Sequence, residues 1–217
     1  MHKINLFVTE ANDNLSACGE IINRAVNTAK EYAFSKLNIT WDIDLIVTNR
    51  VREFIIPEDG VGGRTHSSDL IFVSIDEDKI TEDILSEALV HELCHAARWG
   101  KNNERMNTMF DGIINEGIAT FLESEFVKDN VKKQFFLSTV TSRSEDENIK
   151  IFNYLQNNLR DECYNYQTIF FEGNEKLPRW SGYSLGYFIF KKYLEQTGKN
   201  IEDAFADRYA QIESVLL

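Results

Sequence analysis

The stretch VHELCHAARWG, residues 90–100, constrains this chain more than any other. It carries His91 and His95 four positions apart, with Glu92 directly after the first histidine. On an α-helix, side chains at this spacing project from one face, about 40° apart around the axis and about 6 Å apart along it. Two imidazoles so placed can bind one tetrahedral metal ion, and Glu92 can reach a water beside it as a general base. The motif therefore predicts a metal-binding catalytic helix.

The residues around the motif indicate that this helix is buried. It is expected to begin after Thr81, a candidate N-cap, and to end near Gly100, a candidate C-cap. Its apolar residues are Ile84, Leu85, Ala88, Leu89, Val90, Leu93, Cys94, Ala96 and Ala97. A helix that is apolar nearly all round belongs in a core, where imidazoles and a carboxylate need partners. A metal ion with a water would satisfy all three groups, and neighbouring side chains are the alternative.

A zinc ion that keeps one position open for water needs a third protein ligand. A histidine six residues after His95 is absent, because Lys101 occupies that position. Glu116 is available in the segment DGIINEGIATFLE, residues 111–123. If the chain turns after the first helix and a second helix runs antiparallel to it, Glu116 comes level with His91. The sequence therefore predicts Glu116 as the third ligand.

The second helix, expected over residues 106–127, places Glu123 on the exposed face opposite Glu116. Gly112 and Gly117 flank Glu116. A glycine inside a helix costs about 1 kcal/mol relative to alanine, and close approach of two backbones would explain both. The alternative is a surface glutamate beside glycines that mark a kink.

Two motifs carry a resemblance to a known family. HELCH, followed after twenty residues by EGIA, resembles the gluzincin metallopeptidases. More narrowly, the chain resembles the bacterial family of predicted zinc-dependent proteases, through DGVGGRTHSSDLIFVSID before the motif and SGYSLGYFIFKKYLEQTGKNIEDAF near the C-terminus. The resemblance covers roughly residues 55–205. The Gly-x-Met-Glu-Asn segment of one aminopeptidase group is absent, so exopeptidase activity of that kind is not expected.

The resemblance implies a zinc-dependent peptidase. Neutral His91 and His95 with ionised Glu116 would hold Zn²⁺ and leave one position for water. Glu92 would take a proton from the attacking water and deliver it to the leaving amine. A purely structural zinc site has no need of a base, so Glu92 favours catalysis. Three alternatives stay open: a zinc-stabilised protein-interaction module without catalysis, a zinc amidohydrolase acting on a small amide, and a metal-free helical interaction protein.

The resemblance also implies parts of the substrate site. Gluzincins often stabilise the oxyanion with a tyrosine or histidine, which makes Tyr183 the first choice and Tyr187 the second; the alternative is that both are core residues. An edge strand beside the metal pairs with the peptide in gluzincins, and residues 70–75 fit that strand, with the glycines of 60–63 approaching the substrate. The alternative is a core strand with turn glycines. His66 is expected to face solvent.

Hydrophobic periodicity predicts a small sheet followed by helices. Strands are expected over residues 4–10, 41–49 and 70–75. Helices are expected over residues 14–37, 80–100, 106–127 and 181–196, with a short one from about residue 200. The glycine-rich segment PEDGVGGRTHSS is expected as a loop, and residues 128–178 as helix with undefined ends.

We therefore expect an α+β fold in a single domain, residues 1–217. A small mixed β-sheet forms an N-terminal lobe, about residues 1–100, packed on a mostly helical lobe, about residues 101–217. The resemblance implies a zincin-like arrangement, with the helix of His91 and His95 at the cleft.

Charge and cysteine content narrow the class of protein. The 35 acidic and 23 basic side chains leave a formal net charge of −12. Nucleic acid and anionic membrane surfaces require a basic face, so neither is expected as a partner. Cys18, Cys94 and Cys163 form no C-x-x-C pair, which is typical of a reducing compartment; Cys94 is expected in the core.

The chain shows no sign of a membrane segment or a secretory leader. No run reaches the ~18 apolar residues of a membrane span, and the first residues lack a basic region before a long apolar one. We expect a cytoplasmic protein whose partner is a peptide or protein substrate, with its oligomeric state open.

Overall fold

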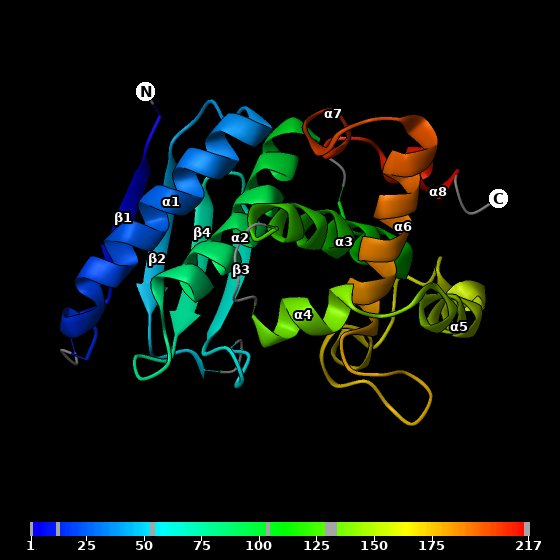
Figure 1. Ribbon diagram of the computed structural model, residues 1–217, viewed down its shortest axis with the longest axis horizontal. Helices are drawn as coiled ribbons and strands as arrows, with labels where there is room; N and C mark the ends of the chain where they lie inside the picture. Colours follow the sequence, from blue (N-terminus) through cyan, green and yellow to red (C-terminus); the bar gives the residue numbers. More distant parts are fainter. Residues whose placement is uncertain (1, 12–13, 53–54, 103–104, 129–133, 215–217) are drawn as a thin grey trace. The chain divides into compact units, whose positions relative to one another are not determined.

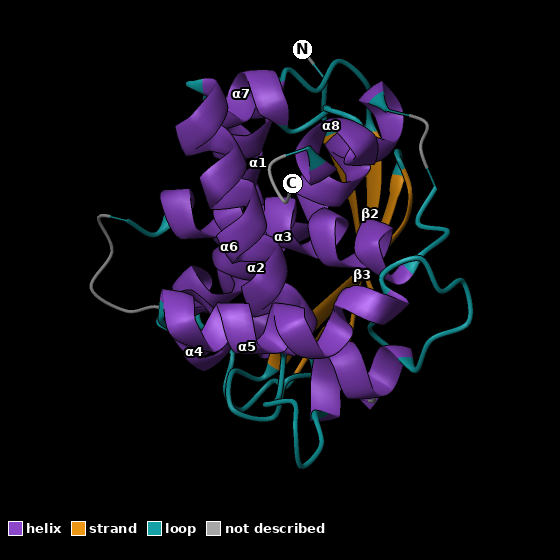
Figure 2. Cartoon of the chain, turned by 90° about the vertical axis from the view of Figure 1, so that its right-hand side faces the viewer, coloured by secondary structure: helices purple, strands orange, loops and turns teal. Residues whose placement is uncertain are grey.

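The computed structural model describes residues 2–11, 14–52, 55–102, 105–128 and 134–214. Within them the fold is mixed α/β, with helix predominating over a small group of strands (Figure 2). The chain divides into two compact units. The first unit comprises Met1–Lys101 and Glu125–Phe136, and the second unit comprises Asn102–Ser124 and Leu137–Leu217.

The strands of the first unit form one mixed sheet in the order β1-β2-β4-β3. They are β1 (Ile4–Val8), β2 (Ile43–Thr48), β3 (Val61–Ser67) and β4 (Leu70–Ile75). β1 and β4 each run parallel to β2, whereas β3 runs antiparallel to β4. Alternate side chains of the two central strands are buried, namely Ile43, Leu45 and Val47 of β2 and Ile71, Val73 and Ile75 of β4. The expected small mixed sheet is confirmed, with one face in the core.

Two long helices pack against each other beside this sheet in the first unit (Figure 1). They are α1 (Gly19–Leu37), preceded by the 3-10 turn η1 (Ser16–Cys18), and α2 (Glu82–Lys101). The expected N-cap of α2 is confirmed, because the backbone N–H of Ile84 donates to Thr81 Oγ1 at 3.3 Å. The expected C-cap is wrong, because Gly100 lies inside α2. A Cβ at Gly100 would lie 2.5 Å from Cη2 of Trp41, so this glycine leaves room for the indole ring.

Two expectations about the strands are wrong. The glycine-rich segment expected as a loop forms the strand β3 over most of its length. Because β3 pairs along β4, β4 lies between two neighbours and is not an edge strand; β1 and β3 are the edges. Residues 70–75 were expected at the edge because a single sequence does not show which strands pair. The alternative of a core strand is the one confirmed.

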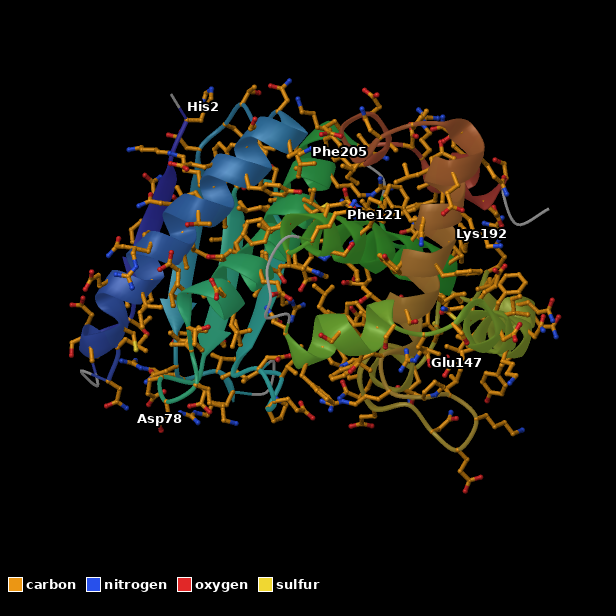
Figure 3. The ribbon with its side chains drawn as sticks, viewed as in Figure 1. His2, Asp78, Phe121, Glu147, Lys192 and Phe205 are labelled. Carbon is orange, nitrogen blue, oxygen red and sulfur yellow. The ribbon has the colours of Figure 1, made fainter. Side chains whose placement is uncertain are left out.

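The second unit is built from helices. The helices after α2 are α3 (Met109–Phe126), α4 (Phe135–Thr141), α5 (Glu145–Leu155), α6 (Ser181–Thr197), α7 (Ile201–Ala204) and α8 (Tyr209–Glu213). Short turns η3 (Gln156–Asn158) and η4 (Thr168–Glu172), the latter a π-helix, connect them. A capping box between Ser144 and Glu147 begins α5; Figure 3 labels Glu147 there. The expected helices at 106–127, 181–196 and after residue 200 are confirmed; the rest lie between 128 and 178, of which residues 129–133 are outside the described chain.

α3 and α6 approach each other closely in the second unit. A Cβ on Gly117 of α3 would lie 2.5 Å from the Cα of Gly186 of α6, and a Cβ on Gly186 would lie 2.8 Å from the Cα of Gly117. These contacts are with backbone, which has no flexible end to move. The close backbone approach expected at Gly117 is therefore confirmed.

α3 is buried on most of its surface, including Glu123, whose side chain is 1% exposed. The expectation that Glu123 faces solvent opposite Glu116 is wrong. The two residues are seven positions apart, about two helical turns, so they share one face. No helix in the described part of the chain combines the length and apolarity needed to cross a membrane.

Candidate metal centre

His91 and His95 lie together on one face of α2. Their ring centroids are 4.8 Å apart, with the rings tilted by 76°. His91 is buried and also contacts the ring of Phe136 edge-on, whereas His95 is partly exposed. The i, i+4 spacing therefore places two imidazoles side by side, as expected from the sequence.

Glu92 projects from α2 toward the edge strand β3. Its side chain is 6% exposed. The hydroxyl of Thr65 lies 2.7 Å from Oε2 of Glu92 and 2.9 Å from its backbone carbonyl oxygen. A Cβ on Gly63 would lie 2.5 Å from Oε1 and 2.6 Å from Cδ of Glu92. The candidate general base therefore lies directly against the glycine-rich strand.

Glu116 lies on α3 and is 6% exposed. The hydroxyl of Tyr166 donates to Oε1 of Glu116 at 3.3 Å. The nearby Tyr164 hydroxyl would lie 2.7 Å from a Cβ on Gly112, so Gly112 makes room for it. Burial raises the pKa of Tyr164 above its ordinary value, and the negative charge of Glu116 raises that pKa further. Sequence reasoning missed both tyrosines, which lie in an irregular segment without periodicity.

His91, His95 and Glu116 each offer one ligand atom, and these atoms all lie within 4.8 Å of one another. Among the residues that the structure describes, this is the one such group of at least three metal-ligating side chains. Two imidazole nitrogens and a carboxylate oxygen are ligands that catalytic zinc takes, each at about 2.0–2.2 Å. By donor type and spacing, these residues could hold a metal ion.

The two tyrosines expected near the oxyanion lie on α6. Tyr183 is buried, with its ring 5.5 Å from Phe170 and 6.3 Å from Phe171, both edge-on. Tyr187 stacks on Phe121, which Figure 3 labels on α3, with ring centroids 5.9 Å apart. These contacts place both tyrosines among aromatic side chains, and their role stays a prediction.

Two further expectations concern residues beside the motif. Cys94 is 1% exposed, which confirms it as a core residue. His66 is exposed on β3 and contacts Phe72 edge-on at 4.9 Å between ring centroids, as expected for a solvent-facing histidine.

The fold and these residues define a mixed α/β protein with two histidines and a glutamate that could bind a metal. A family model described as "Predicted Zn-dependent protease (DUF2268)" matches residues 16–214, and the chain belongs to this family. The resemblance to predicted zinc-dependent proteases is thereby confirmed. No curated protein and no solved structure matches the chain.

Proposed function

We propose that the chain is a zinc-dependent peptidase of the gluzincin type with a zincin-like fold. One observation carries the proposal: His91, His95 and Glu116 each place a ligand atom within 4.8 Å of the others. Glu92 follows the first of these histidines on the same helix. The family's description as a zinc-dependent protease supports the same reaction class.

The roles follow from the chemistry of each side chain. His91, His95 and Glu116 would hold the ion as neutral imidazoles and a carboxylate. Zinc, when bound, polarises the substrate carbonyl and lowers the pKa of water toward neutrality. Glu92 accepts the proton of the attacking water and returns it to the leaving amine. For the oxyanion, Tyr183 stays the first prediction and Tyr187 the second.

The partner that we propose is a peptide or protein chain bound along β3. β3 pairs with β4 on one side. On its other side, the described residues pair with it only through an isolated bridge between Ile56 and Val61. An extended peptide can add to such an edge as a further strand. Because Gly63 and Thr65 lie against Glu92, a peptide on this edge would pass beside the general base.

Elemental analysis of the protein purified without chelator tests the metal site. We expect about one zinc per chain in the wild type and none in the His91→Ala, His95→Ala double variant, because three protein ligands are needed. Glu116→Ala should lose most of the metal. His66→Ala is the matched control, since His66 is exposed on β3, and it should keep the zinc. Absence of metal in the wild type, even after zinc is supplied, would contradict the proposal.

Glu92→Gln tests the chemistry separately from the metal. This variant should keep its zinc but lose turnover of fluorogenic peptides by roughly 10²–10⁴-fold, because the amide accepts no proton. Equal turnover in the variant and the wild type would end the general-base assignment. Zinc without turnover of any peptide would favour a zinc-stabilised interaction module, and turnover of small amides alone would favour an amidohydrolase.

A further inference from the structure

Two residues of β3 face the general base from the same side of the strand. Gly63 and Thr65 are two positions apart, and residues at this spacing point to the same face of a strand. Both are half-buried, whereas Arg64 and His66, which alternate with them, are exposed. Gly63 leaves the space that the Glu92 side chain occupies. Thr65 supplies the only polar side chain among the described residues that hydrogen-bonds the Glu92 carboxylate.

The threonine hydroxyl has one proton and two acceptors in reach. It lies 2.7 Å from Oε2 of Glu92 and 2.9 Å from the Glu92 carbonyl oxygen. Neither acceptor can donate, so the single proton serves both, and its bond to a charged carboxylate is the stronger one. Because one hydroxyl contacts both ends of the residue, it fixes the side chain of Glu92 relative to its own backbone.

We propose that Thr65 is a positioning residue that holds the Glu92 carboxylate in the orientation needed for proton transfer. The proposal rests on the function proposed above, in which Glu92 is the general base. Glu92 has three side-chain torsions, and an unheld carboxylate would spread over several rotamers. The bond to Oε2 selects one of them and directs Oε1 past Gly63.

Steady-state kinetics on zinc-loaded protein tests the positioning role. Thr65→Val keeps the β-branched shape but removes the hydroxyl, and its kcat should fall about 10- to 100-fold with KM changed less than about 2-fold. Thr65→Ser restores the hydroxyl and should keep kcat within about 3-fold of the wild type. Thr48→Val is the matched control, because Thr48 lies on β2 and its hydroxyl accepts from Thr9 Oγ1 at 3.0 Å. It should leave kcat unchanged.

Three outcomes would overturn the proposal. One is an unchanged kcat in Thr65→Val while Glu92→Gln loses turnover. Another is a raised KM with an unchanged kcat, which would make Thr65 a substrate contact. A third is an equal loss in Thr65→Ser and Thr65→Val, which would make the effect one of packing.

A crystal structure of Thr65→Val separates this proposal from the proposed function. We expect the Glu92 carboxylate to leave its place beside Gly63 in the variant and to keep it in Thr65→Ser. A carboxylate that stays in place in Thr65→Val overturns the positioning role, whatever the protein hydrolyses. A displaced carboxylate in a protein that hydrolyses no peptide supports the contact and refutes the peptidase.

Discussion

At the scale of single residues, the space around Glu92 is set by a missing side chain. Gly63 has a backbone that any residue could adopt, since its φ is not positive. What alanine could not do there is avoid the Glu92 side chain, because its Cβ would lie 2.5 Å from Oε1 and 2.6 Å from Cδ. Carbon atoms pack best about 3.5–4.0 Å apart. Gly63 is therefore required by its neighbour and not by its own torsion angles.

Gly63→Ala should lower the free energy of unfolding by about 1–3 kcal/mol, as overpacking of a filled site does. In a Glu92→Ala background the cost should largely disappear, because the atoms that the new methyl group meets are gone. Urea denaturation of the four proteins of this cycle measures the difference. Gly19→Ala is the control, since nothing lies within 4 Å of a Cβ there. An equal cost in both backgrounds would mean that Gly63 is needed for another reason.

At the scale of elements, the second unit depends on contacts that tie the end of α6 to the segment after it. Tyr193 of α6 donates to Oδ2 of Asp207 at 2.7 Å, and Lys199 Nζ lies 2.6 Å from the same oxygen. The hydrogen bond to Asp207 raises the pKa of Lys199. Burial raises the pKa of Tyr193, with the bond to Asp207 adding to it.

Both raised pKa values predict a loss of stability at alkaline pH. The folded state holds these two protons more tightly than the unfolded chain, so the stabilisation is present below the unfolded pKa values of about 10. It is lost as pH rises through the higher folded values. We expect the melting temperature to fall between about pH 9.5 and 11, and to fall less steeply in Asp207→Asn.

Differential scanning fluorimetry across this pH range measures the effect. Asp203→Asn is the control, because Asp203 is exposed nearby, on α7. The same steepness in wild type and Asp207→Asn would show that other groups cause the alkaline loss.

At the scale of the whole molecule, a bound metal would be part of the protein's stability. A ligand that binds only the native state stabilises it by about 4 kcal/mol when its concentration is a thousand times the dissociation constant. For a chain of this size, 1 kcal/mol shifts the melting temperature by about 2–4 °C. Removing zinc should therefore lower the melting temperature by roughly 8–16 °C.

Calorimetry with and without a chelator measures this shift. The His91→Ala, His95→Ala double variant is the control, and chelator should not change its melting temperature. An unchanged wild-type melting temperature, in protein shown to have lost its metal, would contradict a stabilising site.

The sequence by itself determined the features that depend on neighbouring residues. The strand at 70–75 was expected at the bounds that β4 has, because apolar β-branched residues follow one another there. α2 and the shared face of His91 and His95 follow from helical periodicity over twenty residues. Glu116 was selected by its place among apolar residues, and its burial agrees with that. Patterns of this kind are local, so one sequence contains them in full.

Only the tertiary structure decided which distant residues meet. β3 reads as a loop because glycine disfavours strands, yet pairing with β4 and packing against α2 make it one. The bond of Thr65 to Glu92 joins positions 27 residues apart, and that of Tyr166 to Glu116 joins positions 50 apart. Such pairs leave no periodic trace in the chain, because strand order and helix packing bring them together. The reactive groups were therefore readable from sequence, and the residues that hold them in place were not.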